Sequence, residues 1–210
     1  MKILAITGPF GSGKTTVSNF ATAALRSAGV GVALIALDEV ARELIDNSLA
    51  LRHELADAFG LHILHDDSSL DRPALAELAF ADDQSTARLN ALVHPPTITH
   101  ARIVIAEALK AGELPIIELP FPSMYMNDLF QQPDTETLVW TVSADKETRL
   151  ERGLADGFAL EDALRRMDRQ PRISAYETEA RIIIENMDDL GDLRLEVQMA
   201  LEESGLIQAR

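Results

Sequence analysis

The feature that most constrains the fold of this chain is an eight-residue loop close to its start. Residues 8–15 read G-P-F-G-S-G-K-T, which fits the pattern G-x-x-x-x-G-K-[ST] at every fixed position. An apolar run, Lys2–Thr7, precedes the loop, and a segment rich in helix formers, Thr15–Ala28, follows it. A strand, a glycine-rich loop and a helix in this order form the context in which the motif binds phosphate groups. The sequence therefore predicts a phosphate-binding loop at Gly8–Thr15, called the phosphate loop below.

The residues of the phosphate loop have separate predicted roles. Glycines let the backbone curl so that its N–H groups point at phosphate oxygens, and the positive end of the helix dipole adds to that attraction. Lys14 is predicted to reach the β- and γ-phosphates, and the hydroxyl of Thr15 to coordinate Mg²⁺. The other residues predicted to bind the nucleotide here are Gly8, Pro9, Phe10, Gly11, Ser12, Gly13 and Thr16. The chain is thus expected to bind a nucleoside triphosphate.

Apolar runs alternate with helical patterns along the rest of the chain. Further strands are predicted at Gly31–Leu37, Leu114–Leu119, Leu138–Val142 and Arg181–Ile184. Residues 39–110 read as mostly helical, with breaks expected at Gly60, around Asp66–Ser69, and at Pro95 and Pro96. Strands that alternate with helices favour a parallel sheet with helices on both faces. The predicted fold class is α/β, in a single domain spanning residues 1–210.

The charge and the absence of cysteine exclude several classes of protein. The chain carries 19 Lys and Arg against 34 Asp and Glu, a formal net charge of −15. A surface this negative repels nucleic acid and anionic membranes, so the expected partner is a small molecule. No cysteine is present, which excludes disulfides, thiolate nucleophiles and cysteine-ligated zinc. The apolar run Ile3–Ile6 is too short for a signal-peptide core, so a cytoplasmic protein is expected.

Three classes of phosphate-loop protein compete at this point. A GTP switch normally carries a guanine-reading N-K-x-D segment, and the chain has none. A motor ATPase carries an apolar strand that ends in Asp-Glu, and Leu34–Glu39 (LIALDE) has that form. This strand is the very next one after the phosphate loop, whereas such ATPases have further strands in between. In phosphate-loop kinases an acid at that early position faces the acceptor hydroxyl, so the position of Asp38 favours a kinase.

Further sequence blocks follow the phosphate loop in a fixed order. They are Asp38–Leu44, Ser69–Leu75, Phe80–Asp82 and Leu89–Pro95, and more weakly Ile116–Pro120, Leu138–Val142, Arg149–Arg152, Arg166–Gln170 and Ala180–Asn186. The series resembles the dephospho-CoA kinase family over nearly the whole chain. The resemblance implies a P-loop NTPase-type three-layer fold, with a helical acceptor-binding subdomain over about residues 40–112 and a small lid over about 145–175. It also implies transfer of the γ-phosphate of ATP to the 3′-hydroxyl of dephospho-CoA.

Three residues between the second and third strands are candidates for the acceptor side of the site. Asp38 matches the family's acid that orients or deprotonates the ribose hydroxyl, and it is also a plausible N-cap for a helix starting at Glu39. Arg42 lies one helical turn later and either pairs with Asp38, contacts an acceptor phosphate, or forms a surface ion pair. His94 matches an acceptor-contacting histidine, although a histidine in apolar surroundings is often a hydrogen-bonded core residue.

The remaining candidates lie later in the chain. Glu118 matches an acidic position that holds a water on Mg²⁺, or is simply a charged residue at a strand exit. Arg152 and Arg166 are the two arginines that we expect in a lid over the ATP phosphates, where Arg152 would stabilise the transferring charge. Asn186 matches the family asparagine near the adenine site. The segment His62–Asp67 looks like a metal site but matches a variable turn, so no metal is predicted there.

Several positions depart from the usual pattern of this family. Ala36 replaces the first acid of an Asp-x-Asp pair, and the segment Pro120–Met124 lacks a glutamate. The expected lid arginine is missing around Ala155 and Asp156, and Asp188 replaces a glycine. The stretch between the phosphate loop and Asp38 is longer than usual and is similar to that of the uridine-kinase group. Two alternatives therefore stay open: a kinase for another nucleoside-like acceptor, and a non-catalytic ATP-binding protein.

Overall fold

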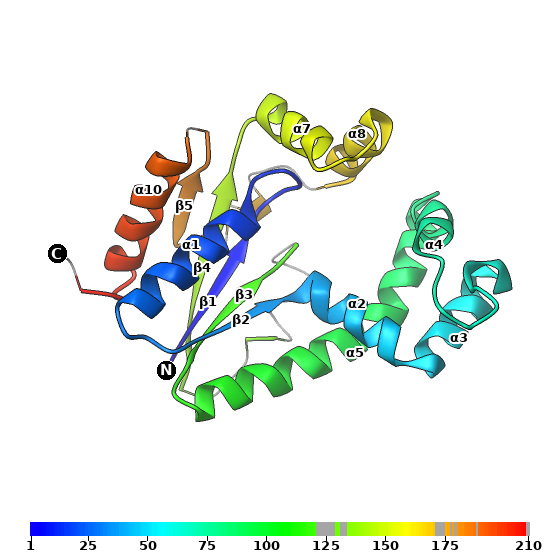
Figure 1. Ribbon diagram of the computed structural model, residues 1–210, viewed down its shortest axis with the longest axis horizontal. Coiled ribbons are helices and arrows are strands. Elements are labelled where there is room, and N and C mark those ends of the chain that lie inside the picture. The colour runs from blue at the N-terminus through cyan, green and yellow to red at the C-terminus, as the bar shows by residue number, and fades with distance from the viewer. Residues whose placement is uncertain are drawn as a thin grey trace. The chain divides into compact units, whose positions relative to one another are not determined.

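The structure, a computed structural model, describes residues 1–120, 129–130, 134–170, 175–176, 178, 180–187 and 189–208. Its helices and strands are labelled in Figure 1. In chain order they are β1 (Lys2–Thr7), α1 (Lys14–Ser27), β2 (Val32–Ala36), α2 (Leu37–Asn47), α3 (Leu49–Phe59), the 3₁₀ turn η1 (Leu61–Ile63), α4 (Arg72–Ala79), α5 (Asp83–Lys110), β3 (Leu114–Glu118), β4 (Glu136–Ser143), α7 (Lys146–Ala155), α8 (Leu160–Arg169), β5 (Ile182–Glu185) and α10 (Leu190–Glu203). The chain divides into two compact units. We call Met1–Ala36 with Val104–Arg210 the sheet unit, and Leu37–Ile103 the helical unit.

The sheet unit is built on one parallel sheet with the strand order β2-β3-β1-β4-β5. Helices flank the sheet, as Figure 1 shows. Central strands of a parallel sheet are covered on both faces, and β1 is accordingly buried from Ile3 to Thr7. The predicted α/β fold class is thus confirmed.

The strands lie where the apolar runs predict them, with ends that differ by at most two residues. The bounds of β1 agree fully with the prediction, whereas β4 is longer than predicted at both ends. The main difference is at β2, which ends at Ala36 because Leu37 and Asp38 already belong to α2. The chain passes from strand to helix without a connecting loop.

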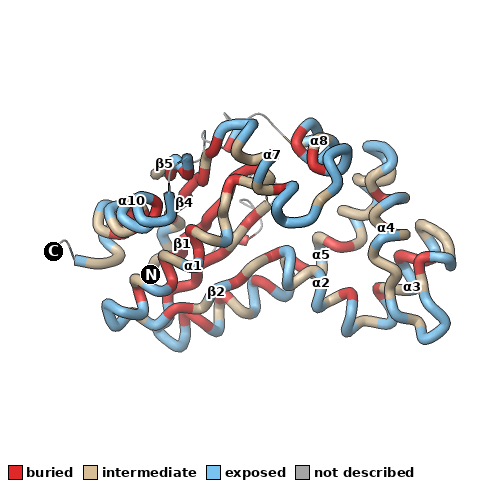
Figure 2. The backbone as a smooth tube through the Cα atoms, turned by 45° about the horizontal axis from the view of Figure 1, so that its top comes forward, coloured by how far each residue is buried: buried red, intermediate tan, exposed pale blue. Residues whose placement is uncertain are grey.

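The core of the sheet unit lies between the strands and two helices. The cluster of buried residues includes Leu25 of α1, Trp140 of β4 and Val197 of α10. Trp140 is fully buried, and its indole Nε1 donates a hydrogen bond to Ser204 Oγ at 3.1 Å. Figure 2 shows buried residues running along β1 and β4. Each large apolar side chain buried in this way stabilises the fold by about 1.5–3 kcal/mol.

The helical unit has an apolar core of its own. It consists of Ile45, Leu51, Leu55, Ala56, Ile63, Leu75, Ala79 and Val93. Two helices around it begin at capping side chains: Ser48 Oγ accepts the N–H of Leu51 at 3.1 Å, and Asp71 Oδ1 accepts the N–H of Ala74 at 3.0 Å. Such caps satisfy N–H groups that have no partner within the helix.

The helix α5 contradicts the break predicted at Pro95 and Pro96, because it continues through both prolines. Each proline removes one backbone donor, but neighbouring side chains bond the helix backbone in the same region. Thr97 Oγ1 donates to Val93 O at 2.7 Å, and Thr99 Oγ1 donates to Pro95 O at 2.9 Å. Val93 and Thr97 are buried, so side-chain packing keeps this turn helical despite the prolines.

The helices differ from membrane spans in their composition. A span needs about 20 consecutive, mainly apolar residues. The longest helix, α5, has enough residues but mixes polar and charged side chains throughout. In the part of the chain that the structure describes, no helix combines the length and the apolarity that a bilayer crossing requires.

Candidate functional site

The phosphate loop connects β1 directly to α1 in the sheet unit. Gly11 and Gly13 have left-handed backbones, with φ of 73° and 89°. Gly13 is the N-cap residue of α1, and its carbonyl accepts the N–H of Val17 at 3.1 Å. A side chain in such a conformation costs about 1–2 kcal/mol, which explains why glycine stands here. The loop predicted from the motif is thus present between the predicted strand and helix.

Two side chains from the far end of the chain hold this loop in place. Asn186, buried directly after β5, donates through Nδ2 to Ser12 O at 2.8 Å. Arg152 of α7 donates to the main-chain and side-chain oxygens of Asn186 at 3.0 and 3.2 Å, and to Ser12 O at 3.4 Å. A Cβ at Gly13 would lie 2.2 Å from Asn186 Nδ2. The close approach of Asn186 therefore requires glycine at position 13.

The segment formed by α7 and α8 contacts the other half of the phosphate loop. The Phe10 ring meets the Phe158 ring edge to face, with centroids 5.1 Å apart, and lies so close to Gly153 that a Cβ there would come within 2.6 Å of it. The guanidinium of Arg166 lies 4.7 Å above the Phe158 ring. The N–H of Phe10 donates to Gln170 Oε1 at 2.7 Å.

Lys14, Thr15 and Glu118 supply the charged and oxygen groups next to the loop. Lys14 Nζ donates to Pro9 O at 3.2 Å, and Thr15 Oγ1 donates to Glu118 Oε1 at 2.7 Å. Glu118 is the last residue of β3 and pairs in register with Ile6 of β1. The edge of the sheet where parallel strands end is the usual ligand site of such folds.

The oxygen atoms beside the loop fit a magnesium ion. Mg²⁺ is usually held by one or two carboxylates together with substrate phosphates. Glu118 and Thr15 offer one carboxylate and one hydroxyl at hydrogen-bond distance from each other. The buried hydroxyl of Ser12 has no hydrogen-bond partner among the described residues, which leaves it available within the same loop.

Arg149, in α7, lies against the phosphate loop through its main chain. A Cβ at Gly11 would lie 2.3 Å from Arg149 O, so this arginine lies against the loop backbone. Burial lowers the pKa of Arg149, and Tyr176 and Asp145 partly offset that effect. The pKa of Asp145 is lowered by hydrogen bonds from Thr148, and burial raises that of Tyr176 to about 12.

The helical unit contains the other predicted site residues. Asp38 lies in the first turn of α2, which begins at Leu37. The alternative in which Asp38 caps a helix starting at Glu39 is therefore wrong, since β2 passes directly into the helix one residue earlier. Burial lowers the pKa of His94, and the nearby Asp38 carboxylate acts in the opposite direction. The structure thus brings Asp38 and His94 close to each other.

Arg42 does not join this pair. Its side chain is exposed, and within the described residues it forms no ion pair with Asp38. Its main-chain carbonyl accepts a hydrogen bond from Arg72 Nη2 at 3.3 Å, and Arg72 also pairs with Asp46 at 2.7 Å. The predicted pairing of Arg42 with Asp38 is therefore wrong, because Arg42 points to solvent.

The structure also adds residues that the sequence patterns do not single out. Phe158 and Gln170 contact the phosphate loop. The only sequence feature that could have indicated this contact is that Gln170 ends the block Arg166–Gln170 of the family resemblance. Arg165 pairs with Asp162 at 3.1 Å on the exposed face of α8. Residues 121–124 of the segment that lacks a glutamate, and Asp188, lie outside the described residues.

No metal cluster accompanies the histidines of the helical unit. Within the described residues, no group of three or more His, Cys, Asp or Glu side chains could hold a metal ion. The segment His62–Asp67 instead forms a turn in which the His65 N–H donates to Ser69 O at 2.9 Å. Asp67 Oδ1 accepts the N–H of Ser69 at 2.9 Å, and the hydroxyl of Ser69 also donates to it.

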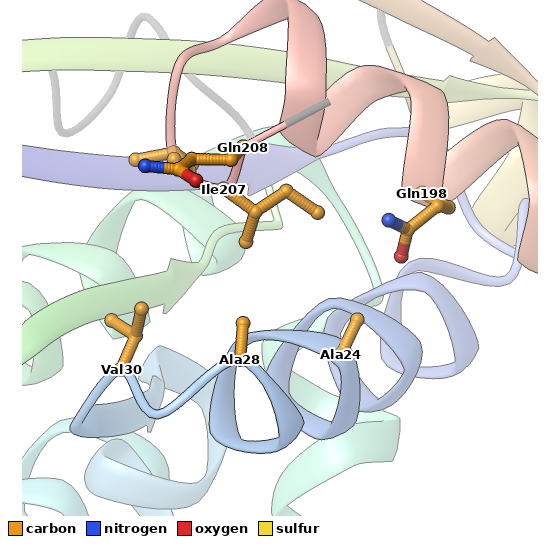
Figure 3. A pocket seen from close by; sticks show the side chains of 7 residues that line it. Ala24, Ala28, Val30, Gln198, Ile207 and Gln208 are labelled. Atoms are coloured by element: carbon orange, nitrogen blue, oxygen red, sulfur yellow. The ribbon is translucent and has the colours of Figure 1, made fainter. Parts of the chain in front are cut away.

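A pocket of about 570 Å³ lies at the opposite end of α1 from the phosphate loop (Figure 3). Its lining residues are Ala24, Ala28, Val30, Gln198, Leu206, Ile207 and Gln208. None of these side chains is charged, so this lining offers no cation for a phosphate group. From Lys14 to Ala24 the helix rises about 15 Å. The pocket is therefore separate from the phosphate-loop site.

Comparisons of the sequence with a family model and with individual proteins indicate the same family. The family model described as dephospho-CoA kinase matches residues 2–192. A dephospho-CoA kinase from Geobacter sulfurreducens is 30% identical over 190 residues, which cover 89% of this chain and 90% of that protein. One from Corynebacterium glutamicum is 31% identical over 201 residues, which cover 95% of this chain and 98% of that protein. A crystal structure from Thermus thermophilus is 30% identical, covers 96% of each chain and has a TM-score of 0.69. The extent of these matches means that the chain belongs to the dephospho-CoA kinase family.

Proposed function

We propose that this chain transfers the γ-phosphate of ATP to the 3′-hydroxyl of dephospho-CoA, giving coenzyme A and ADP. The observation that carries the proposal is the complete phosphate loop, Gly8–Thr15, with Glu118 bonded to Thr15, in a chain whose family match extends from residue 2 to residue 192. The expected partner is accordingly a small molecule rather than a nucleic acid. In this proposal residues 40–112 contain the acceptor-binding subdomain, and residues 145–175 the lid.

The chemical step is an in-line displacement at phosphorus. The acceptor oxygen forms a bond to the γ-phosphorus while the bond to the β–γ bridging oxygen breaks, and ADP leaves with that electron pair. We assign Asp38 as the group that orients the hydroxyl and takes its proton. Lys14 and the N–H groups of the phosphate loop stabilise the charge on the transferring group and on ADP.

Magnesium has a defined place in this proposal. Thr15 and Glu118 are the residues that would hold it, Thr15 directly and Glu118 through a water. When bound, Mg²⁺ would supply positive charge that neutralises the phosphate oxygens of ATP. The oxygen atoms of these two side chains are the ligand type that Mg²⁺ prefers, and their short separation supports the assignment.

We assign the other predicted residues either to binding of the nucleotide or to binding of the phosphoryl acceptor. Arg152, which is bonded to Ser12 O, is assigned to the transferring charge, and Arg166 to the ATP phosphates. Asn186 is assigned to the nucleotide site near the adenine. His94 and Arg42 are assigned to the acceptor: the exposed guanidinium of Arg42 can meet an anionic group, and the half-buried ring of His94 is the residue of the pair that would contact the rest of the acceptor.

The test measures ADP release from Mg²⁺-ATP by the purified protein, with and without dephospho-CoA, and identifies coenzyme A by mass. Acceptor-dependent ADP release with coenzyme A formed supports the proposal. Binding of ATP without any stimulation by dephospho-CoA contradicts it and favours another nucleoside-like acceptor or a non-catalytic nucleotide-binding protein. These alternatives rest on Ala36, which pairs in register with Glu118. The family carries an acid at this position.

Two substitutions test the assigned roles. Lys14→Ala is expected to abolish turnover. Asp38→Asn is expected to lower kcat by about 10²-fold or more, since general bases contribute effects of this size, with ATP affinity nearly unchanged. Glu39→Gln is the matched control, because Glu39 is an exposed acid in the same first turn of α2. An unchanged kcat in Asp38→Asn would show that the base has been wrongly assigned.

A further inference from the structure

The main-chain N–H of Phe10 is where the phosphate loop meets the end of α8. It donates a hydrogen bond to Gln170 Oε1 at 2.7 Å, across a sequence separation of 160 residues. Gln170 is the C-cap residue of α8, with φ −77° and ψ 148°. This bond fixes the side-chain amide of Gln170 beside the loop.

Aromatic contacts hold the end of α8 at the same place. The rings of Phe10 and Phe158 meet edge to face, and Arg166 stacks on Phe158. Arg166 precedes Gln170 by four residues, and residues four apart in a helix lie on the same face. The contacts of Arg166 and Gln170 therefore direct one face of α8 toward Phe10.

The chemistry of a primary amide determines what Gln170 can do there. Its oxygen accepts hydrogen bonds, and its NH₂ group donates two. Because the Phe10 N–H is a donor, it must bond Oε1 of Gln170. The two N–H donors of the Nε2 group are then not used in this bond. The N–H groups of a phosphate loop point at phosphate oxygens, which can only accept. The NH₂ group of Gln170 thus lies at the rim of a site for phosphate oxygens, which accept hydrogen bonds.

The position of Phe10 indicates which phosphate is involved. In a phosphate loop the inner phosphates are held by N–H groups where the helix begins, and in this chain that place is Gly13–Thr15. Phe10 precedes these residues and lies against α7 and α8, which also contribute Arg152 and Arg166. A donor held on Phe10 would therefore lie at the outer end of a bound triphosphate.

We propose that Gln170 binds the terminal phosphate of ATP, with Oε1 anchored on the Phe10 N–H and Nε2 donating to a γ-phosphate oxygen. The inference rests on the proposed function, because it requires ATP in the phosphate loop. It makes Gln170 a residue that distinguishes ATP from ADP, since ADP lacks the group that Nε2 contacts.

The test compares the affinities of Gln170→Leu for a non-hydrolysable ATP analogue and for ADP, each with Mg²⁺, by titration calorimetry. The expected result is a loss of about tenfold to hundredfold for the analogue, typical of a hydrogen bond to a charged group, and less than about twofold for ADP. Gln170→Glu keeps an acceptor for the Phe10 N–H but replaces the donors with negative charge. It is expected to weaken binding of the analogue further, whereas a merely structural role would be rescued by it.

Gln198→Leu is the matched control. Gln198 lines the separate pocket of Figure 3, and its Nε2 donates to Glu202 Oε1 at 3.0 Å within α10. This variant is expected to bind both nucleotides like the wild type. An equal loss of both nucleotides in Gln170→Leu, or no loss at all, would overturn the inference.

The same measurements separate this inference from the proposed function. If the wild type binds ATP and ADP but does not phosphorylate dephospho-CoA, the proposed function fails, and the ratio of the two affinities still decides the role of Gln170. If coenzyme A is formed but the ratio is unchanged in Gln170→Leu, the inference fails alone. If the wild type binds neither nucleotide, both are overturned.

Discussion

Gly13 and Gly29 lie at the two ends of α1, and both have left-handed backbones, with φ of 89° and 81°. Their surroundings differ. A Cβ at Gly13 would lie 2.2 Å from Asn186 Nδ2, whereas a Cβ at Gly29 would meet nothing within 4 Å. Substituting alanine at Gly29 therefore measures the free-energy cost of the left-handed backbone alone. The same substitution at Gly13 measures that cost together with the cost of the close contact with Asn186.

This pair leads to a prediction with its own control. Gly29→Ala is expected to lower the free energy of unfolding by about 1 kcal/mol, the cost of a left-handed alanine. Gly13→Ala is expected to lower it further and to abolish ATP binding, because Asn186 must leave Ser12. Chemical denaturation and titration with ATP measure the two effects. Equal stability losses in the two variants, with ATP binding kept, would contradict the role of the Asn186 contact.

His94 adds a pH-dependent contribution to stability. Burial lowers its pKa below the ordinary value of 6.5, despite the nearby Asp38 carboxylate. The folded chain then binds this proton less readily than the unfolded chain does. The contribution of His94 is therefore fully present above the unfolded pKa and is lost as the pH falls through that value toward the lower, folded pKa.

The predicted consequence is a smaller fall of Tm on acidification in His94→Gln than in the wild type, between about pH 7.5 and about pH 5.5. His100→Gln is the control, since His100 is an exposed histidine in the same helix. Melting curves across this pH range measure the difference. A His94→Gln variant with the same acid dependence as the wild type would show that burial of His94 does not affect its protonation.

At the level of elements, the sequence predicts features that depend on neighbouring residues and misses those that depend on distant ones. The phosphate loop and β1 follow from a local motif and a local apolar run, and both are found where predicted. The bond between Phe10 and Gln170 joins residues 160 positions apart, so no local periodicity contains it. The same reasoning explains why α5 crosses Pro95: local propensity favours a break, and packing around Thr97 overrides it.

The continuity of α5 gives a prediction for Pro95. This proline is exposed within the helix, so Pro95→Ala restores a backbone donor without removing buried contacts. It is expected to raise the free energy of unfolding by about 1–3 kcal/mol, the interior cost of proline less its effect on the unfolded chain. Pro73→Ala is the control, because Pro73 is exposed in the first turn of α4, where proline is favourable. Equal effects at the two positions would show that the helix around Pro95 is not an ordinary α-helix.

On the scale of the whole molecule, the proposed chemistry draws on both units. The sheet unit contains the phosphate loop, Glu118 and the arginines Arg152 and Arg166, and the helical unit contains Asp38 and His94. Each unit has its own buried apolar cluster, which stabilises the residues that this unit contains. Substitutions in one core are therefore expected to act first on the functional residues of the same unit.

Net charge is the other property of the whole molecule, and it predicts how salt affects stability. Four ion pairs join described residues, all with exposed side chains, and exposed pairs contribute about 0–1 kcal/mol each. The negative charges of a chain of net charge −15 repel one another and lower its stability. Salt screens this repulsion. Screening should remove more repulsion than attraction, so Tm is expected to rise from about 20 to about 300 mM NaCl near neutral pH.

The control for this prediction uses the same protein at another pH. The isoelectric point of about 4.6 means that the net charge becomes small near about pH 5, so the repulsion that salt screens at neutral pH is then nearly absent. The rise of Tm with NaCl should therefore shrink or vanish there, while any effect of salt on apolar burial would persist at both pH values. A fall of Tm with salt at neutral pH would instead mean that attraction between charged groups outweighs repulsion, and that the local pairing around Arg72, Arg165 and the phosphate loop dominates the electrostatics of the fold.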